Sequence, residues 1–421
     1  MTDVPTDAAG EAAGRSAPTR RRTQRFRSRQ AAIVRAAVTL INTKGVRGAT
    51  LAEVAARLGI GPTAVMYYFA SKEELAAACF REALDLYEAL ISEAERGETP
   101  QDRLRLFVCG YFAVARDIAQ GKRHPIAVFN DVRALNDPAI IEGYVNMWRR
   151  ARALFGPRPP HGRKRQALNA ITHLVISQLF WSVAWLPRYA PEDYDRVAAL
   201  MADILERGLA APGRGWEGAP IVELETQASG EDPSRETFLR AATETINEHG
   251  YRGASVDRIS ARLKVTKGSF YHHNEAKDDL VIACFRRTLE VMRRAQRLAL
   301  ETASDGWGQL CASAAALVYC QVSRRIPLLR TSALSAVPEA LRGGLLRQFD
   351  RVSLNFSWMI SDGVADGSVR SLDAHVGAQM VTAMINAAAE LELWVGELPP
   401  KEATEVYVRG LLTGLSSALS S

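Results

Sequence analysis

The chain has few cysteines and no long uninterrupted apolar run. Five Cys in 421 residues is a low and odd number. It excludes a secreted protein built on disulfides and favours a reducing compartment. The longest apolar stretch, from His173 to Leu186, is interrupted by Ser177, Gln178 and Ser182; it is too short to span a bilayer and predicts a buried helix. No apolar segment follows the N-terminal arginines, so no secretory signal is expected. We expect a soluble cytoplasmic, nucleoid-associated protein that does not contact membranes.

The sequence also lacks the common motifs of enzymes and cofactor sites. It contains no His/Cys cluster with metal-ligand spacing, no phosphate-binding Gly-rich loop and no Gly-x-Ser-x-Gly elbow. The neighbouring His272 and His273 would point about 100° apart on a helix, which is unsuited to holding one ion. We therefore expect no catalytic residue, no metal and no cofactor.

Positive charge is concentrated in two segments. The net charge is +6, and residues 1–81 contain 13 Lys/Arg against 6 Asp/Glu. Residues 234–286 contain 9 against 7, so the rest of the chain is mildly acidic. Contacts with phosphates need such local patches, which favours nucleic acid as a partner. A solvated basic tail explains the first excess equally well.

An internal repeat organises the chain. Residues 29–81 align with 234–286 at a constant offset of 205 without a gap, and 18 of the 53 positions are identical. Near the end of each half, Trp185 and Pro191 match Trp394 and Pro400 at an offset of 209. The pattern predicts a tandem duplication of one structural unit.

Two segments lie outside the repeat. Residues 210–233 are rich in Pro, Gly and acidic residues without helical periodicity, which predicts a linker. Residues 1–24 have little apolar content and predict a disordered basic arm. Six arginines lie close together around the start of the repeat, at Arg20, Arg21, Arg22, Arg25, Arg27 and Arg29. The sequence leaves two alternatives open: the arginines are simply solvated, or they follow backbone phosphates or enter the minor groove.

Each repeat shows helical periodicity and almost no strand signal, so the predicted fold class is all-α. Thr50 begins a short helix with a capping box, and Ser255 caps its counterpart. These helices end at Gly59 and Lys264, in a left-handed turn where a non-Gly residue costs about 1 kcal/mol. A further short helix begins at Pro62, where a missing N–H is harmless. A helix, a tight turn and a second short helix form a helix-turn-helix motif, whose later helix lies in the major groove of DNA.

Both copies resemble the N-terminal DNA-binding region of TetR-family transcriptional regulators. The resemblance is carried by GVRGATLAEVAARLGIGPTAVMYYFASKEEL from Gly45 and by GYRGASVDRISARLKVTKGSFYHHNEAKDDL from Gly250. It implies a helix-turn-helix head followed by a helical ligand-binding and dimerisation bundle in each half. The implied domains are 25–72 and 73–209 in the first half, and 234–277 and 278–421 in the second.

The resemblance implies a set of DNA-contacting residues in each head. In the first head they are Arg47, Thr50, Thr63, Ala64, Tyr67, Tyr68 and Lys72. In the second they are Arg252, Ser255, Thr266, Lys267, Gly268, Ser269, Tyr271, His272 and Lys277. Of these, Thr50, Ser255, Lys72 and Lys277 match positions that contact phosphates in the family. Met66 stands where the family usually has Tyr, and Asn274 where it usually has Phe.

The two copies differ most in the recognition helix. Between residues 60–68 and 265–273 not one position is identical. Because different side chains prefer different bases, we hypothesise that the two heads read different half-sites of an asymmetric operator. The alternative is that one head has diverged and contacts phosphates only.

In TetR-like proteins the last two helices of each subunit pair with those of the partner. The matching segments are Lys164–Trp185, Asp193–Leu209, Leu372–Trp394 and Lys401–Leu419. Fusion of the two units makes their docking intramolecular, at a high effective concentration. The resemblance therefore implies an intramolecular pseudo-dimer on a double-stranded DNA operator, and leaves further homodimerisation of chains open.

The resemblance also implies a small apolar effector that weakens DNA binding. The candidate ligand-binding residues are Phe129, Tyr144, Trp148, Gln178, Trp181, Asn355, Trp358, Met359 and Met384. Other residues at buried-looking positions are His124, Asn130, His173, Met380 and Glu390. Pockets of this kind combine apolar walls with a few polar groups, although such stripes are more often plain core. We expect a repressor that is released by its effector. The alternative is a helical small-molecule-binding module with one or both heads degenerate.

Overall fold

The structure is a computed structural model that describes residues 17–129, 132, 135–157, 159, 162–216, 224, 233–264, 277–337, 339–396 and 398–415. Apart from helices and the loops between them, these residues form one isolated antiparallel bridge, between Ala210 and Val369. The prediction of an all-α fold is confirmed. The chain forms two compact units, residues 1–83 with 125–140, and residues 84–124 with 141–421.

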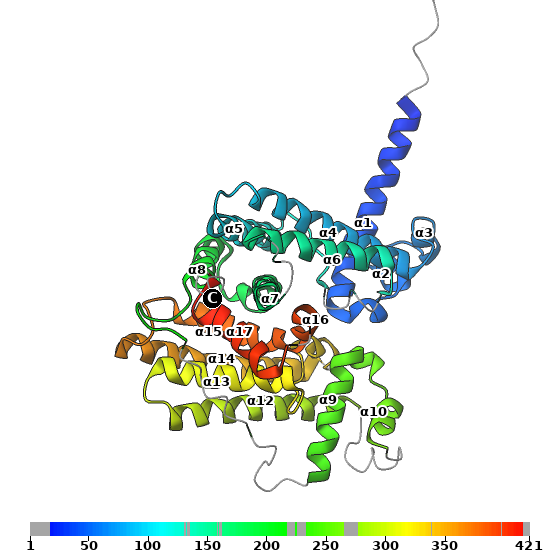
Figure 1. Ribbon diagram of the computed structural model, residues 1–421. Helices are drawn as coiled ribbons and strands as arrows, with labels where there is room; N and C mark the ends of the chain where they lie inside the picture. Colours follow the sequence, from blue (N-terminus) through cyan, green and yellow to red (C-terminus); the bar gives the residue numbers. More distant parts are fainter. Residues whose placement is uncertain are drawn as a thin grey trace, which may run out of the picture. The chain divides into compact units, whose positions relative to one another are not determined.

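The first unit contains the first head. Its helices are α1 (Ala17–Gly48), α2 (Leu51–Arg57), α3 (Pro62–Met66) and the start of α4 (Lys72–Ala94) (Figure 1). Gly45 has a φ of 70° and sharply kinks the end of α1. The predicted capping box of Thr50 with Glu53 is present, and Pro62 is the first residue of α3 as predicted. Ile33, Val65 and Phe80 are fully buried and form part of the core on which these helices pack.

Helix α1 begins earlier than the sequence indicated. It includes residues 17–24, so the prediction of a disordered arm is wrong for this segment, and residues 1–16 lie outside the described residues. Pro18 is in the first turn, where its missing N–H costs nothing. The Arg and Gln residues that follow are good helix formers, and they continue a helix already held by its core.

An asparagine ties each head to a loop of its bundle. In the first unit, Asn42 Nδ2 donates to the carbonyl oxygen of Ile126 at 2.8 Å, and the N–H of Val128 donates to Asn42 Oδ1 at 3.0 Å. Asn247, 205 residues later, makes the same pair of bonds to Leu328 and Arg330, at 2.9 and 3.0 Å. These bonds explain why the first compact unit includes residues 125–140 and extends beyond the predicted 25–72.

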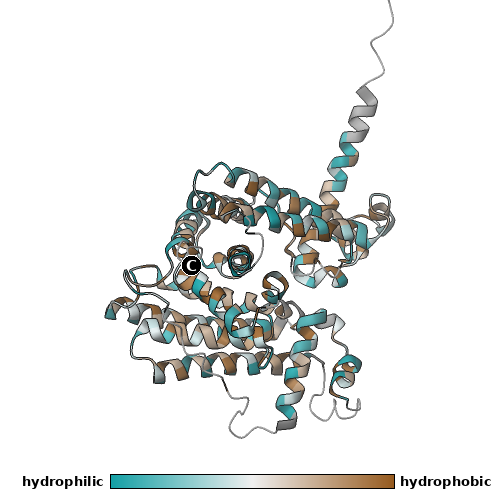
Figure 2. Cartoon of the chain, in the orientation of Figure 1, coloured by the Kyte–Doolittle hydropathy of each residue, from teal (hydrophilic) through white to brown (hydrophobic). Residues whose placement is uncertain are grey.

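The second unit contains the second head and most of both bundles. Its helices are the C-terminal parts of α4 and α6 (Pro138–Phe155), α5 (Pro100–Ala119), α7 (Arg163–Trp185), α8 (Tyr194–Arg207), α9 (Pro233–Gly253), α10 (Val256–Leu263), α12 (Lys277–Thr302), α13 (Gly306–Ser323), α14 (Glu339–Asp366), α15 (Ala374–Ala387), α16 (Glu392–Val395) and α17 (Pro400–Leu412). Short 3₁₀ turns lie at Leu186–Arg188, Pro191–Asp193, Thr331–Ala336 and Ala388–Glu390. Figure 2 shows hydrophobic and hydrophilic residues alternating along α12 and α14, as amphipathic helices require.

The second head is held to its bundle by a buried ion pair. Arg287 of α12 is 5% exposed, binds Glu236 of α9 at 2.6 Å and donates to the carbonyl oxygen of Pro327 at 2.8 Å. The aligned positions of the first half, Ala31 and Glu82, cannot form this pair. The second head therefore groups with the bundles instead of forming the separate domain expected for residues 234–277.

Helix α7 is the centre of the second unit. Among the described helices, one segment, Arg163–Arg188, is long and apolar enough by composition to cross a membrane, with a mean hydropathy of 1.3. However, 61% of that window is buried within the protein, and α7 packs against α15, α16 and α17. The interpretation of this stretch as a buried core helix is confirmed.

The helices that were predicted to pair across the two halves do pack together within this unit. Gln178 Nε2 donates to the carbonyl oxygen of Met380 at 3.0 Å, and Asn169 Nδ2 donates to that of Trp394 at 2.9 Å. The predicted single helix Leu372–Trp394 is wrong, because α15 ends at Ala387 and α16 follows after a 3₁₀ turn. This break accompanies an ion pair of Glu390 with Arg330 and a stack of the Trp394 ring on Trp148.

The C-terminal ends of α8 and α17 cross with their backbones in close contact. A Cβ on Gly208 would lie 2.4 Å from the carbonyl carbon of Thr413, and one on Gly414 would lie 2.5 Å from the carbonyl oxygen of Glu206. Each glycine thus approaches the end of the other helix, the reciprocity expected of a two-fold interface. Next to the crossing, the N–H of Leu209 donates to the carbonyl oxygen of Leu412 at 2.8 Å.

We expect Gly208→Ala and Gly414→Ala to destabilise the second unit strongly, since both clash with backbone that cannot rotate away. Gly213 is a matched control because its φ is also positive, at 84°, but no atom lies within 4 Å of a Cβ there. Gly213→Ala should lower the free energy of unfolding by roughly 1–2 kcal/mol, the cost of a side chain at a positive φ. Gly208→Ala and Gly414→Ala should lower it by at least about 1 kcal/mol more. Urea unfolding measures the difference. Equal losses for all three variants would contradict a tight crossing.

His173 lies buried where α7 meets α17. Its Nδ1 is 2.9 Å from the hydroxyl oxygen of Tyr407, and its ring stacks on Trp148. Burial lowers the pKa of His173 to about 4, and the charges of Glu390 and Arg330 act on it in opposite directions. The imidazole is therefore neutral in the folded chain at neutral pH.

The free energy of unfolding should fall in acid partly because of His173. Its folded pKa is below the ordinary value of about 6.5, so its contribution is complete above that pH and is lost as the pH falls towards 4. The loss should be roughly 3 kcal/mol. His173→Gln should flatten this part of the pH profile, while His124→Gln, at an exposed position, should leave it unchanged. The same slope in wild type and His173→Gln would contradict the assignment.

Candidate DNA-binding surface

Helix α3 presents an exposed face built by residues four positions apart. Val65 and Phe69 are 0% and 2% exposed and hold the helix against the head. Thr63 and Tyr67 lie on the opposite, exposed face, and Tyr67 is 74% exposed. So large an exposed aromatic on a short, well-anchored helix is free to contact a partner. Ala64 and Tyr68 are half-buried at the edge of this face.

Three of the predicted DNA-contacting residues of the first head lie together. Lys72 Nζ, at the start of α4, donates to the carbonyl oxygen of Arg47 at 3.3 Å. Thr50 and Lys72 line the same small hollow. The hydroxyl of Thr50 accepts from the N–H of Glu53 at 3.2 Å and donates to its carboxylate at 2.9 Å. Arg47 is exposed beside them, so two cations gather at the start of α2.

The charge of Glu53 is balanced within the head. Lys44 Nζ is 2.5 Å from its Oε1. The hydrogen bonds from Lys44 and then Thr50 lower the pKa of Glu53 below its ordinary value. The carboxylate is therefore ionised but paired with Lys44. Arg57, at the end of α2, is exposed and has no ion-pair partner among the described residues. Arg57 was not among the DNA-contacting residues predicted from the sequence, although it is one of the positions repeated identically.

The second head differs in how it holds the equivalent arginine. Arg262, the counterpart of Arg57, is bound by Glu244 at 2.7 Å and Glu248 at 2.8 Å. The aligned residues of the first head are uncharged threonines. Ser255 caps α10 as predicted, by accepting from the N–H of Arg258 at 3.2 Å. The cation of Arg262 is therefore neutralised locally, whereas that of Arg57 is not.

Most of the second head's predicted contacts lie outside the described residues. These are Thr266, Lys267, Gly268, Ser269, Tyr271 and His272, together with Asn274 and the side chains of Arg252 and Lys277. The turn before them is described: Lys264 has a φ of 56° and a left-handed conformation, as predicted from its alignment with Gly59. The same turn is therefore made by Gly in one head and by Lys in the other.

The predicted ligand-binding residues do not form one site. Tyr144 and Trp148 belong to an aromatic cluster with His173 and Trp394, in which the two Trp rings are 3.9 Å apart. Gln178 bonds elsewhere, to Met380, and Trp181 is half-buried. Packed rings with no space between them stabilise the contact between α6, α7 and α16. The core interpretation of this stripe therefore fits the geometry better than a ligand pocket.

The remaining candidates are dispersed among separate parts of the core. Phe129 stacks on Phe80 in the first unit, and Met359 and Met384 are buried in the second. Asn355 Nδ2 donates to Gln296 Oε1 at 2.9 Å. Two expectations of burial are wrong: Trp358 is 58% exposed on α14 and His124 is exposed. Asn130 lies outside the described residues.

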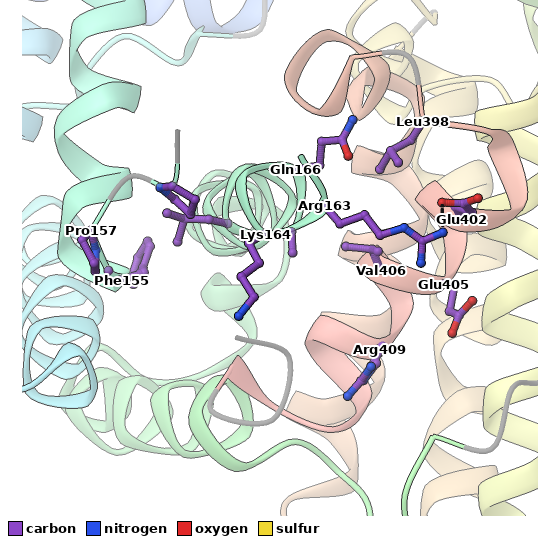
Figure 3. A pocket seen from close by; sticks show the side chains of 14 residues that line it. Phe155, Pro157, Arg163, Lys164, Gln166, Leu398, Glu402, Glu405, Val406 and Arg409 are labelled. Atoms are coloured by element: carbon purple, nitrogen blue, oxygen red, sulfur yellow. Dashed lines mark ion pairs between the residues drawn. The ribbon is translucent and has the colours of Figure 1, made fainter. Parts of the chain in front are cut away.

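A pocket of about 370 Å³ lies elsewhere in the second unit (Figure 3). It is formed by the end of α6, the start of α7 and the face of α17. Arg163 and Glu402 form an ion pair of 2.9 Å at its wall, and Lys164 also lines it. Its apolar walls include Phe155, Leu168, Leu398 and Val406. The pocket thus combines apolar surface with a few charged groups, and none of its residues was among the ligand-binding residues predicted from the sequence.

Comparison with known proteins agrees with the geometry of the heads. The family model described as "Bacterial regulatory proteins, tetR family" matches residues 33–79 and again residues 238–284. These two ranges cover α1 to α4 of the first head and the aligned residues of the second.

Curated relatives match parts of the chain. The Transposon Tn10 TetC protein of Escherichia coli is 35% identical over 75 residues, which cover 18% of this chain and 38% of that protein. The HTH-type transcriptional repressor DhaR of Mycobacterium sp. (strain GP1) is 28% identical over 140 residues, covering 33% and 71%. The HTH-type transcriptional regulator RutR of Escherichia coli (strain K12) is 29% identical over 105 residues, covering 25% and 50%. The chain thus spans from under two fifths to about seven tenths of these relatives.

Among solved structures, a TetR family transcriptional regulator, PfmR from Thermus thermophilus, aligns with a TM-score of 0.36 and 20% identity. The alignment covers 42% of this chain and 97% of that one. The family matches, by contrast, fall on the two segments whose sequence and local geometry predicted helix-turn-helix heads. The chain therefore contains two segments, residues 33–79 and 238–284, that each match the tetR family of bacterial regulatory proteins.

Proposed function

We propose that the chain is a sequence-specific DNA-binding regulator of transcription that acts in the cytoplasm, as a repressor released by a small molecule. The observation that carries this proposal is the pair of segments on one chain that match the tetR family of bacterial regulatory proteins. The exposed face of α3, with the cations of Arg47 and Lys72 beside it, has the shape and charge to enter a major groove between phosphates.

Both heads act on one operator as an intramolecular pseudo-dimer. The support is the packing of α7 and α8 against α15 and α17, where helices of the two halves are joined by His173, Gln178 and the crossing at Gly208. A partner fused to the chain does not dissociate at low protein concentration. One chain is then enough to occupy two half-sites.

The two half-sites differ in sequence. The support is the absence of identity between residues 60–68 and 265–273, together with the different state of Arg57 and Arg262. Side chains that differ at base-reading positions prefer different bases. An operator for this chain is therefore not a perfect palindrome, in contrast to the operator of a symmetric dimer.

The effector occupies the pocket between α6, α7 and α17. Its lining joins apolar groups to the cations of Arg163 and Lys164, which suits a small, largely apolar molecule with an anionic group. Because the pocket joins the first half to the second half of the interface, an occupant that spreads α7 from α17 would alter the pairing of the two halves.

Selection of preferred duplexes from a random pool tests the proposal directly. We expect enrichment of one site with two unlike halves. On that duplex, Tyr67→Ala should weaken binding about tenfold, within the roughly 1–3 kcal/mol that removal of a base or groove interaction costs. Trp358→Ala, which removes another exposed aromatic, from α14, is the matched control and should bind as wild type does.

Two results would contradict the proposal. Absence of any preference among duplexes, even at low salt, would rule out sequence-specific binding and leave a helical ligand-binding module. A perfect palindrome as the preferred site would keep DNA binding but rule out unlike half-sites.

A further inference from the structure

The N-terminal part of α1 runs beyond the core of the first head. Its buried residues begin at Ile33, and residues 24–29 are all exposed. One aromatic side chain fastens this segment to the head. The ring centre of Phe26 lies 4.8 Å from that of Tyr68 and 6.0 Å from that of Tyr67. The extension is therefore anchored on the residues that end the recognition helix.

Three arginines surround this anchor. On a helix, Arg25 and Arg29 lie on one side of Phe26, about 100° and 60° away, and Arg27 lies on the other side, about 100° away. All three are exposed, and none has an ion-pair or hydrogen-bond partner among the described residues. The sequence holds no Asp or Glu between Glu11 and Glu53. This concentration of unbalanced charge favours a polyanion as its partner.

The position of the arginines beside the recognition helix indicates which polyanion they bind. Phe26 contacts Tyr67, and Tyr67 is the most exposed large side chain on the face proposed to enter the groove. A duplex that meets this face brings its backbone next to residues 24–29. Guanidinium groups bind phosphates well through paired N–H donors. The partner is therefore the same duplex, outside the bases that α3 reads.

The sequence that precedes the second head differs from this segment. At the offset of 205, Phe26 aligns with Glu231, Arg25 with Gly230 and Arg27 with Asp232. The corresponding segment therefore has none of the three arginines and contains two acidic residues, Glu231 and Asp232, which repel phosphates. The difference between the two heads extends beyond their recognition helices to the length of duplex that each can hold.

We infer that residues 24–29 form a second DNA-contacting surface, present beside the first head only, which binds backbone phosphates flanking that head's half-site. The inference rests on the proposed function, since it assumes a duplex on the first head. It adds that the bound site is longer on one side than on the other, and that Phe26 positions the arginines without touching DNA itself.

The test compares three variants of the full chain on the selected duplex. The first carries Arg25→Gln, Arg27→Gln and Arg29→Gln. The second carries Phe26→Ala. The matched control loses the same charge from exposed arginines of the second unit, by Arg123→Gln, Arg196→Gln and Arg297→Gln. The dissociation constant is measured over a series of salt concentrations, and thermal melting by circular dichroism confirms that each variant is folded.

The triple variant of Arg25, Arg27 and Arg29 should have a shallower dependence of log K on the logarithm of the salt concentration. The slope should fall by about 0.9 for each phosphate that is no longer neutralised, or about 2 to 3 in all. The control should keep the wild-type slope. Phe26→Ala should give an intermediate slope, since its arginines remain but are no longer held. Trimming the duplex beyond the first head's half-site should weaken wild type and leave the triple variant unchanged.

An unchanged slope in the triple variant would show that residues 24–29 do not bind phosphates. A wild-type slope for Phe26→Ala would show that Phe26 does not position the arginines. Both outcomes differ from failure of the proposed function, in which wild type itself prefers no duplex. Trimming the opposite end of the duplex should affect wild type and variant equally; a larger effect there would also overturn the inference.

Discussion

The backbone crossing of α8 and α17 is the contact on which the arrangement of the second unit depends. Gly208 and Gly414 let two helix ends approach without side chains between them. Around the crossing, Arg370 donates to the carbonyl oxygen of Gly208 at 2.7 Å and pairs with Asp203 at 2.6 Å. Away from the crossing, Gln178 of α7 and Met380 of α15 also join the two halves. A clash at either glycine would separate the halves at their closest point.

Duplication followed by divergence explains why the halves are alike in frame and different in detail. Asn42 and Asn247 make the same two bonds to their bundle loops. In contrast, a buried Arg287–Glu236 pair holds the second head only. Two copies on one chain are free to diverge, because each contact across the halves needs to be satisfied once, whereas a symmetric dimer must satisfy it twice. The chain can therefore specialise one head without altering the other.

Local features of the fold could be predicted from the sequence because they depend on neighbouring residues. The capping box at Thr50, Pro62 at the start of α3 and the left-handed turn at Lys264 are examples. Features set by distant contacts could not be predicted in this way. The break after Ala387 coincides with packing on Trp148 and Arg330, far along the chain. Hydropathy alone could not distinguish the exposed Trp358 from the buried Met359 beside it.

The same distinction between local features and distant contacts applies to the candidate DNA-binding surface. The exposed positions of α3 could be inferred from the repeat, because helical spacing decides which side chains point away from the core. The role of Phe26 depends on its contact with Tyr68 of the head. In the sequence, the only indication of this role is that Phe26 is a single aromatic residue among arginines. The central claim is that one chain supplies both heads to one operator. Native mass spectrometry of the chain on its selected duplex tests this claim most directly: one chain per duplex is predicted, and a complex that forms only with two chains would contradict it.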